Sequence, residues 1–286
     1  MSNPINVFLF GILMACVCIL IKVIGFFIQK GFTKEVIKEI DKINFIVEWF
    51  FWVFTFSIFM YFLRNYNHPG KLFLIIWGII FGSLIISFGF IVSPILILLQ
   101  KRKYTTSNYY QDWARETIDC CIQIRIIKLA HANAYATGIF ASNKVILLSE
   151  LLINNMQEED IKNIIFHEYA HLRNNHLFIL YLSNVLCCSI SVISTSYFYP
   201  LFEKTANPGL CVTLHGAIFG ILYIIIPGIV QRKLEYHADR FAAIAVGREA
   251  YSKSLLNLNT ITNKGLEKVV VNYPNLNERL KHVSNF

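Results

Sequence analysis

The chain has 286 residues, of which 55% are hydrophobic and only 15% are charged. A soluble domain usually carries about 25% charged residues, so this composition predicts a polytopic membrane protein. The net charge is +8, but no basic stripe with interleaved aromatic residues occurs outside the apolar segments, which argues against nucleic-acid binding. The seven cysteines form no C-x-x-C pair, which argues against a zinc knuckle or a dithiol redox motif.

Five apolar segments are long enough to cross a lipid bilayer as helices, which takes about 20 residues each. They cover approximately 5–29, 43–63, 72–99, 177–201 and 208–230. Pro94 lies within the third segment and predicts a kink or an early end there. Two glycine pairs, Gly78 with Gly82 and Gly216 with Gly220, have the G-x-x-x-G spacing of close helix contacts.

The distribution of lysine and arginine predicts the orientation of these spans. The loop 30–42, the segment that begins at residue 101 and the segment after residue 230 are rich in basic residues, whereas the loops 64–71 and 202–207 are poor in them. Basic residues concentrate on the cytoplasmic side. We therefore expect an integral protein, of the bacterial plasma membrane, with its N-terminus outside and its large polar segments in the cytoplasm.

The polar segments carry the remaining predicted elements. Residues 108–130 look helical, and residues 144–148 look like a short strand. A further helix begins with the acidic turn at 157–160 and runs to about Asn174. The sequence thus predicts a mainly α protein with about five spans and a small β element. Its expected domains are a membrane region, 1–100, and a second region, 101–286, interrupted by a transmembrane hairpin at about 177–230.

The most informative motif is H-E-x-x-H, formed by His167-Glu168-Tyr169-Ala170-His171. Positions four apart lie on one face of a helix, so His167 and His171 can present two imidazoles to one metal ion. Glu168 is rotated from His167 by about 100°, where it can reach a water on that metal. Two neutral nitrogens with a nearby carboxylate are typical of a hydrolytic zinc site.

A catalytic zinc ion takes three protein ligands, so a third must come from elsewhere. His176 is one candidate, but no glycine turns the chain between it and His171, and a histidine at a helix end is the better interpretation. Glu235 is the preferred candidate. Asp239 lies four residues later on the same helix face, where it can accept a hydrogen bond from the outer nitrogen of a ligating histidine.

The membrane topology favours Glu235 as a metal ligand. The alternative is that Glu235 and Asp239 are only a solvated pair of acidic residues on a helix. Two predicted spans joined by a short loop separate Glu235 from His171. A helical hairpin crosses the membrane and returns, so it delivers Glu235 to the same side as His167 and His171. An odd number of spans would have excluded the site.

Four ordered motifs over about residues 105–286 resemble the membrane-embedded zinc metallopeptidases of the HtpX and CAAX-prenyl-endopeptidase superfamily, closest to the HtpX type. The first is the H-E-x-x-H helix. The others are Asn133-Ala134-Tyr135-Ala136-Thr137-Gly138, Arg232-x-x-Glu235-Tyr236-x-Ala238-Asp239 and Tyr273-Pro274-x-Leu276-x-x-Arg279-Leu280. The resemblance implies a mini-gluzincin core fused to membrane helices. The chain departs from the HtpX pattern in having three predicted spans, not two, before this core.

The resemblance also implies roles for individual residues. One Zn²⁺ per chain would be held by His167, His171 and Glu235, with Glu168 as the general base of peptide hydrolysis. Residues that would support a ligand or the substrate are Asp239, Asn133, Arg232, Tyr236 and His237. The last three are candidates for stabilising the oxyanion, although a helix-packing or surface role is the slightly better interpretation of each. A polypeptide substrate would bind as an added strand along 144–148.

Three other uses of the same sequence stay open at this stage. A signalling or peptide-maturation protease would share the site residues. A membrane metallopeptidase of an antibiotic-sensing receptor is a weaker alternative, because no sensor domain follows the last span. A non-catalytic transport or immunity protein with a vestigial metal site would not require Glu168, so the intact glutamate favours an enzyme.

Overall fold

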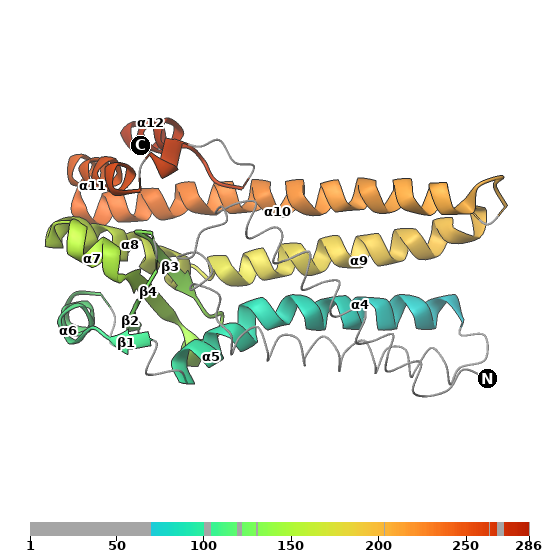
Figure 1. Ribbon diagram of the computed structural model, residues 1–286, viewed down its shortest axis with the longest axis horizontal. Helices are drawn as coiled ribbons and strands as arrows, with labels where there is room; N and C mark the ends of the chain where they lie inside the picture. Colours follow the sequence, from blue (N-terminus) through green and yellow to red (C-terminus); the bar gives the residue numbers. More distant parts are fainter. Residues whose placement is uncertain are drawn as a thin grey trace. The chain divides into compact units, whose positions relative to one another are not determined.

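The structure, a computed structural model, describes residues 70–99, 104–118, 122–129, 131–202, 204–262, 264–267 and 272–285. The spans predicted over 5–29 and 43–63 lie outside these residues. The described part is mainly helical and contains a four-stranded sheet (Figure 1). The chain divides into two compact units, one of Met1–Phe88 with Val185–Gly220 and one of Gly89–Asn184 with Ile221–Phe286.

Three described helical segments are long and apolar enough to cross a membrane, namely Ile75–Leu99, His176–Phe198 and Leu214–Val246. They confirm three of the five predicted spans. The first of them consists of α4 (Lys71–Ser87), a π-helical turn (Phe88–Val92) and α5 (Ser93–Leu99). Pro94 is the second residue of α5. It has no N–H to donate and its ring crowds the carbonyl four residues earlier, at Phe90, which accounts for the π-helical turn there.

The first unit contains α4 and parts of α9 (His176–Phe202) and α10 (Pro208–Val246). A Cβ atom at Gly78 would lie 2.7 Å from Val192 Cγ1, so this glycine allows α4 and α9 to approach closely. The first G-x-x-x-G pair therefore makes the predicted helix contact. For Gly216 and Gly220 no described atom would lie within 4 Å of such a Cβ, so this pair makes no close helix contact within the described residues.

The sheet lies in the second unit and has the order β1-β2-β4-β3. Its strands are β1 (Tyr104–Thr106), β2 (Gln123–Ile127), β3 (Ala134–Thr137) and β4 (Val145–Ser149). β4 pairs in parallel with β2 and antiparallel with β3, and all its residues are buried. The strand predicted at 144–148 is therefore real, but both its edges are occupied. The prediction that it receives the substrate is wrong, and β3 is the edge strand beside it.

The helix predicted over 108–130 is also wrong in its second half. It ends as α6 (Asn108–Thr117), and β2 begins six residues later at Gln123. The side chain of Gln111 on α6 donates to the carbonyl of Ile122 and accepts from the backbone N–H of Ile124. These two bonds replace helical bonds at the start of β2, where isoleucines favour an extended chain.

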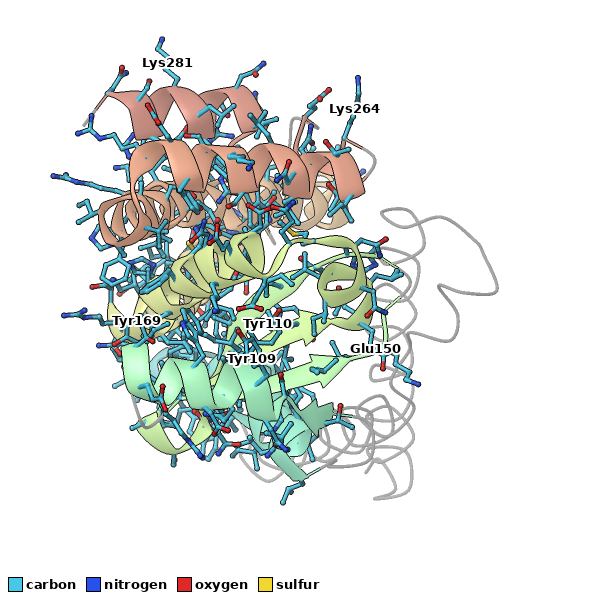
Figure 2. All side chains as sticks on the ribbon, turned by 90° about the vertical axis from the view of Figure 1, so that its left-hand side faces the viewer. Tyr109, Tyr110, Glu150, Tyr169, Lys264 and Lys281 are labelled. Carbon is cyan, nitrogen blue, oxygen red and sulfur yellow. The ribbon has the colours of Figure 1, made fainter. Side chains whose placement is uncertain are left out.

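The remaining helices of the second unit are α7 (Glu150–Asn155), α8 (Glu158–Arg173), α11 (Arg248–Ile261) and α12 (Leu276–Ser284), with 3₁₀ turns at Ala141–Asn143 and Gly265–Glu267. These helices pack in succession, with α7 and α8 against the sheet, α11 against α8, and α12 against α11 (Figure 2). The helix predicted to end near Asn174 is α8, and its acidic first turn is present. A core that includes Ile124, Leu148 and Ile165 joins α8 to the sheet.

Buried polar bonds join α8 to α11. The hydroxyl of Ser254 donates to Asp160 Oδ1 at 2.7 Å, and Asn257 Nδ2 donates to Asp160 Oδ2 at 2.7 Å. Asn163 Nδ2 donates to Ser254 Oγ at 3.0 Å. The polar side chains of Asp160, Asn163 and Ser254 thus have partners, and these bonds fix the N-terminal half of α8, which precedes the H-E-x-x-H residues.

Helix α10 is one continuous helix of 39 residues with Pro227 inside it. At 1.5 Å per residue it is about 58 Å long, nearly twice the about 30 Å of a bilayer's hydrocarbon core. The apolar segment and the Glu235 motif share this one helix.

Candidate functional site

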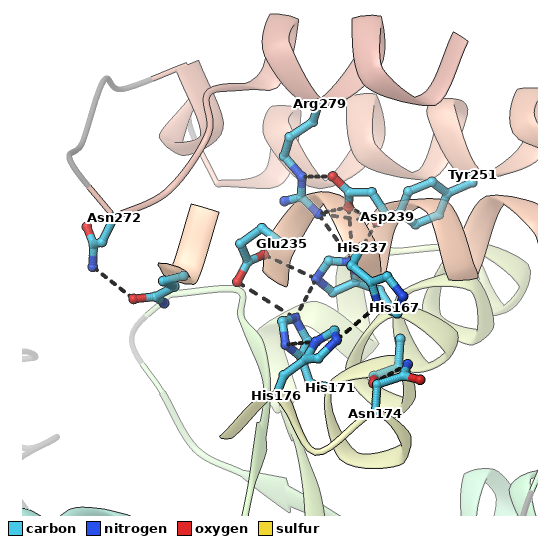
Figure 3. A network of polar contacts seen from close by, with 12 residues as sticks. His167, His171, Asn174, His176, Glu235, His237, Asp239, Tyr251, Asn272 and Arg279 are labelled. Atoms are coloured by element: carbon cyan, nitrogen blue, oxygen red, sulfur yellow. Dashed lines mark hydrogen bonds and ion pairs between the residues drawn. The ribbon is translucent and has the colours of Figure 1, made fainter. Parts of the chain in front are cut away.

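Two histidines of α8 and one glutamate of α10 meet within the second unit. His167 Nε2 and His171 Nε2 lie 3.3 Å apart, one helical turn from each other. Glu235 Oε2 lies 3.4 Å from His167 Nε2, and Oε1 lies 3.7 Å from His171 Nε2 (Figure 3). The three possible ligand atoms all lie within 4.8 Å of one another, and the side chains are little exposed.

This group fits a metal ion in its donors and in its spacing. Tetrahedral zinc with bonds of about 2.0–2.2 Å separates its ligand atoms by about 3.3–3.6 Å. The 3.3 Å between the two imidazole nitrogens matches that geometry, and each nitrogen has one carboxylate oxygen of Glu235 nearby, Oε2 at 3.4 Å from His167 and Oε1 at 3.7 Å from His171. Two imidazole nitrogens and one carboxylate are also a donor set found in catalytic zinc sites. Three protein ligands leave a fourth position for water or substrate.

The nitrogen of His167 that faces away from Glu235, Nδ1, contacts the buried carboxylate of Asp239. This nitrogen lies 3.0 Å from Asp239 Oδ1 and 2.9 Å from the hydroxyl of Tyr251, which itself donates to Asp239 at 2.6 Å. Arg279 completes the group, since its Nε donates to Asp239 Oδ2 at 2.9 Å. The structure thus places Asp239 where the sequence suggested, at the outer nitrogen of a ligand-type histidine.

Tyr251 and Arg279 were not among the predicted site residues. Arg279 belongs to the tail motif by which the chain resembles the metallopeptidases, so that motif could have indicated Arg279 as a site residue. Tyr251 belongs to no motif. Both side chains come from helices that return to the site, α11 and α12, and both are buried there.

The electrostatic surroundings shift the pKa values of His167 and His171 in opposite directions. Burial lowers the pKa of His167, but hydrogen bonds to Asp239 and Glu235 outweigh burial and raise it to about 9. Burial also lowers the pKa of His171, where it dominates and leaves a value of about 3. His171 is therefore neutral at physiological pH, as a metal ligand must be, whereas a proton on His167 has to leave when a metal binds.

Glu168 lies in a buried position next to the two histidines and faces β3. Burial raises the pKa of its carboxyl to about 7, although nearby His167 and a hydrogen bond from the backbone of Ala136 lower it. A carboxyl that titrates near neutral pH can both accept and return a proton. The link to Ala136 also puts this carboxyl beside the edge strand.

The edge strand β3 ends directly before Gly138, the last residue of the Asn133–Gly138 motif. Gly138 has a φ of +94°, a conformation that favours glycine. A Cβ atom there would lie 1.9 Å from the backbone oxygen of Asn143. Asn133, at the other end of β3, has an exposed side chain, and its backbone exchanges hydrogen bonds with Ser149.

The turn after α8 fixes the position of His176. Asn175 takes a positive φ of 53°, and the side chain of Lys144 donates to the carbonyl of Leu172 at 2.6 Å, capping the helix end. His176 then begins α9 and is buried. It is not one of the three clustered ligand atoms, because its Nδ1 contacts the Nδ1 of His171, on the opposite side of that ring from Glu235.

The three candidate oxyanion residues of α10 have structural contacts. Arg232 forms an ion pair with Glu278 at 2.8 Å and donates to the carbonyl of Tyr273. The ring of Tyr236 packs on His282 with centroids 4.7 Å apart, and His237 contacts His176. Tyr273 was not predicted as a site residue. Burial, followed by the nearby carboxylates of Glu235 and Glu168, raises the pKa of its phenol, although 44% of the residue's surface is exposed.

Together with the three apolar helices, this arrangement defines the chain as a membrane metallopeptidase, a hydrolase of peptide bonds. A profile of peptidase family M48 matches residues 119–286, more than half of the sequence, and the chain belongs to that family. Protease HtpX of Glaesserella parasuis is 27% identical over 215 residues, which are 63% of this chain and 75% of that protein. Protease HtpX of Haemophilus influenzae is 25% identical over 217 residues, 64% and 75% of the two chains.

A solved structure shows the same fold. The crystal structure of Ste24p from S. mikatae has a TM-score of 0.61 and 18% sequence identity, and the match covers 80% of this chain. The chain spans 62% of the length of Ste24p. The predicted fold class is confirmed in its helical content and its small sheet. The family match and the HtpX relatives confirm the predicted relationship to the HtpX and CAAX metallopeptidases.

Proposed function

We propose that this chain is a zinc-dependent endopeptidase that cleaves unfolded or membrane-associated polypeptides at the cytoplasmic face of a bacterial plasma membrane. The observation that carries the proposal is the convergence of His167, His171 and Glu235 at ligand spacing, with the Glu168 carboxyl beside them. The division into a membrane region, 1–100, and a catalytic region, 101–286, is part of the same proposal.

The residues would share the chemistry as follows. Zinc, when bound by the two histidines and Glu235, supplies Lewis-acid polarisation of a peptide carbonyl and acidifies water. Glu168 accepts the proton of the attacking water and returns it to the leaving amine, for which its pKa of about 7 is suited. Asp239 holds the ring of His167 in one tautomer, and Arg279 keeps Asp239 ionised.

Substrate would bind along β3, the edge strand, rather than along β4. β3 pairs on one side with β4, and the backbone of Ala136 in β3 already reaches Glu168. An extended peptide added to this edge would place a peptide bond near the base, and backbone pairing selects extended shape rather than sequence. Tyr273 is the exposed hydrogen-bond donor that we assign to the carbonyl oxygen of the substrate.

The test is Glu168→Gln in the full chain, purified in detergent. We expect zinc content to stay at one ion per chain, while cleavage of an unfolded protein such as casein falls by about 10²–10⁴-fold because the base is lost. Glu159→Gln, an exposed carboxylate on the same helix, is the matched control and should cleave normally. Undiminished cleavage by Glu168→Gln would refute the assigned mechanism.

A further inference from the structure

A row of three histidines extends from the candidate metal centre. His171 Nδ1 lies 3.2 Å from His176 Nδ1, and His176 Nε2 lies 3.0 Å from His237 Nδ1 (Figure 3). The rings meet edge to face, with centroids 5.0 Å and then 4.9 Å apart. The two nitrogen–nitrogen distances are hydrogen-bond lengths, so in each pair one nitrogen donates a proton and the other accepts it.

The proton positions in this row follow from the chemistry of imidazole. A neutral ring has one donor nitrogen and one acceptor nitrogen. His171 offers Nε2 towards Glu235, so a metal there requires its proton on Nδ1, which donates to His176 Nδ1. His176 must then carry its proton on Nε2 and donate to His237 Nδ1. A single set of tautomers satisfies every contact.

His176 is the residue on which this row depends. It is buried, with 3% of its surface exposed, and it begins α9 immediately after the turn that Asn175 and Lys144 fix. A buried imidazole needs partners for both nitrogens, and His171 and His237 supply them. His237 is exposed and closes the row towards solvent. The other ligand-type histidine, His167, is held instead by the carboxylate of Asp239.

We propose that His176 is a positioning residue, supported by His237, which holds His171 in the one tautomer and ring orientation that lets Nε2 bind the metal. The inference deepens the proposed zinc site and depends on it. It assigns to His176 neither a ligand bond nor a contact with substrate. The acceptor nitrogen of His176 therefore matters more than its aromatic ring, which makes two substitutions informative.

The experiment measures the zinc dissociation constant of the detergent-solubilised full chain by competition with a chromophoric chelator. His176→Phe keeps a ring but removes the acceptor, and we expect about 10–100-fold weaker zinc binding. His176→Asn places an amide oxygen near the position of Nδ1, and its affinity should stay within about threefold of the wild type. Thermal unfolding of the metal-free variants checks that each one folds.

His237→Phe gives a second test on an exposed residue that tolerates substitution. We expect a loss of zinc affinity smaller than that of His176→Phe, and no additional loss when the two are combined, because His237 acts through His176. His282→Phe, a histidine outside the row, is the control and should bind zinc normally. Additive losses in the double variant would overturn the proposed row.

Other outcomes separate this inference from the proposed function. Unchanged zinc affinity in His176→Phe would overturn the positioning role while leaving the zinc site standing. Equal, large losses in His176→Phe and His176→Asn would overturn it in favour of direct ligation by His176. A wild-type protein that binds no zinc would contradict the proposed function and this inference together.

Discussion

Arg279 is the side chain whose loss should destabilise the protein most clearly. It donates two hydrogen bonds to Asp239, a carboxylate with 0% of its surface exposed. Replacing Arg279 by leucine leaves that charge buried without its cation. Removing one partner of a buried ion pair costs about 3–5 kcal/mol, more than the pair itself contributes, because the remaining charge is desolvated and unpaired.

The expected effect is a lower melting temperature. A domain of 150–250 residues loses about 2–4 °C per kcal/mol, so Arg279→Leu should melt about 6–20 °C below the wild type. The assay is thermal unfolding of the metal-free, detergent-solubilised protein, which keeps metal binding from adding stability. Adding Asp239→Asn removes the unpaired charge and should recover part of the loss.

The control is a matched arginine–aspartate pair on the surface. Arg115 and Asp112 lie 3.6 Å apart, and their side chains are 57% and 66% exposed. Such pairs contribute about 0–1 kcal/mol, so Arg115→Leu should shift the melting temperature by at most about 4 °C. Equal shifts for Arg279→Leu and Arg115→Leu would refute the reasoning about burial.

Three more predictions follow from single features of the site. Gly138→Ala should destabilise the edge strand and abolish cleavage, since its Cβ would meet the backbone of Asn143; a normal melting temperature would contradict this. Tyr273→Phe should lower kcat by about 10²–10³-fold with little change in KM if the phenol binds the carbonyl oxygen, and a pure KM effect would reject that role. The folded pKa of His167, about 9, exceeds its ordinary value of 6.5, so its stabilisation of the metal-free protein is full below pH 6.5 and is lost as pH rises through 9. Melting temperatures measured from pH 7.5 to 10 test this, and His167→Gln should lack the decline through about pH 9.

The sequence predicted those parts of the site that depend on local spacing. Helical periodicity was sufficient to put His167 and His171 on one face, and the acidic start of α8 marked where that helix begins. The hairpin argument brought Glu235 to the same side of the membrane. Asp239 followed from its position one turn after Glu235, and the structure places it at His167.

Features that depend on long-range contacts were missed or misplaced. A short apolar run such as Gln123–Ile127 fits a helix or a strand by periodicity, and its pairing with β4 decides the outcome. The order of strands in the sheet depends on pairing partners, which is why β3 rather than β4 forms the edge. Tyr251 and Arg279 reach the site through the packing of α11 and α12, which no local pattern encodes.

The central claim is that two imidazoles and the carboxylate of Glu235 hold one zinc ion. The most direct measurement is zinc per chain, by atomic emission, in purified wild-type protein and in Glu235→Ala. We predict about one ion in the wild type and less than about a tenth of an ion in the variant, because two histidines alone bind zinc weakly. A full equivalent of zinc retained by Glu235→Ala would contradict the account.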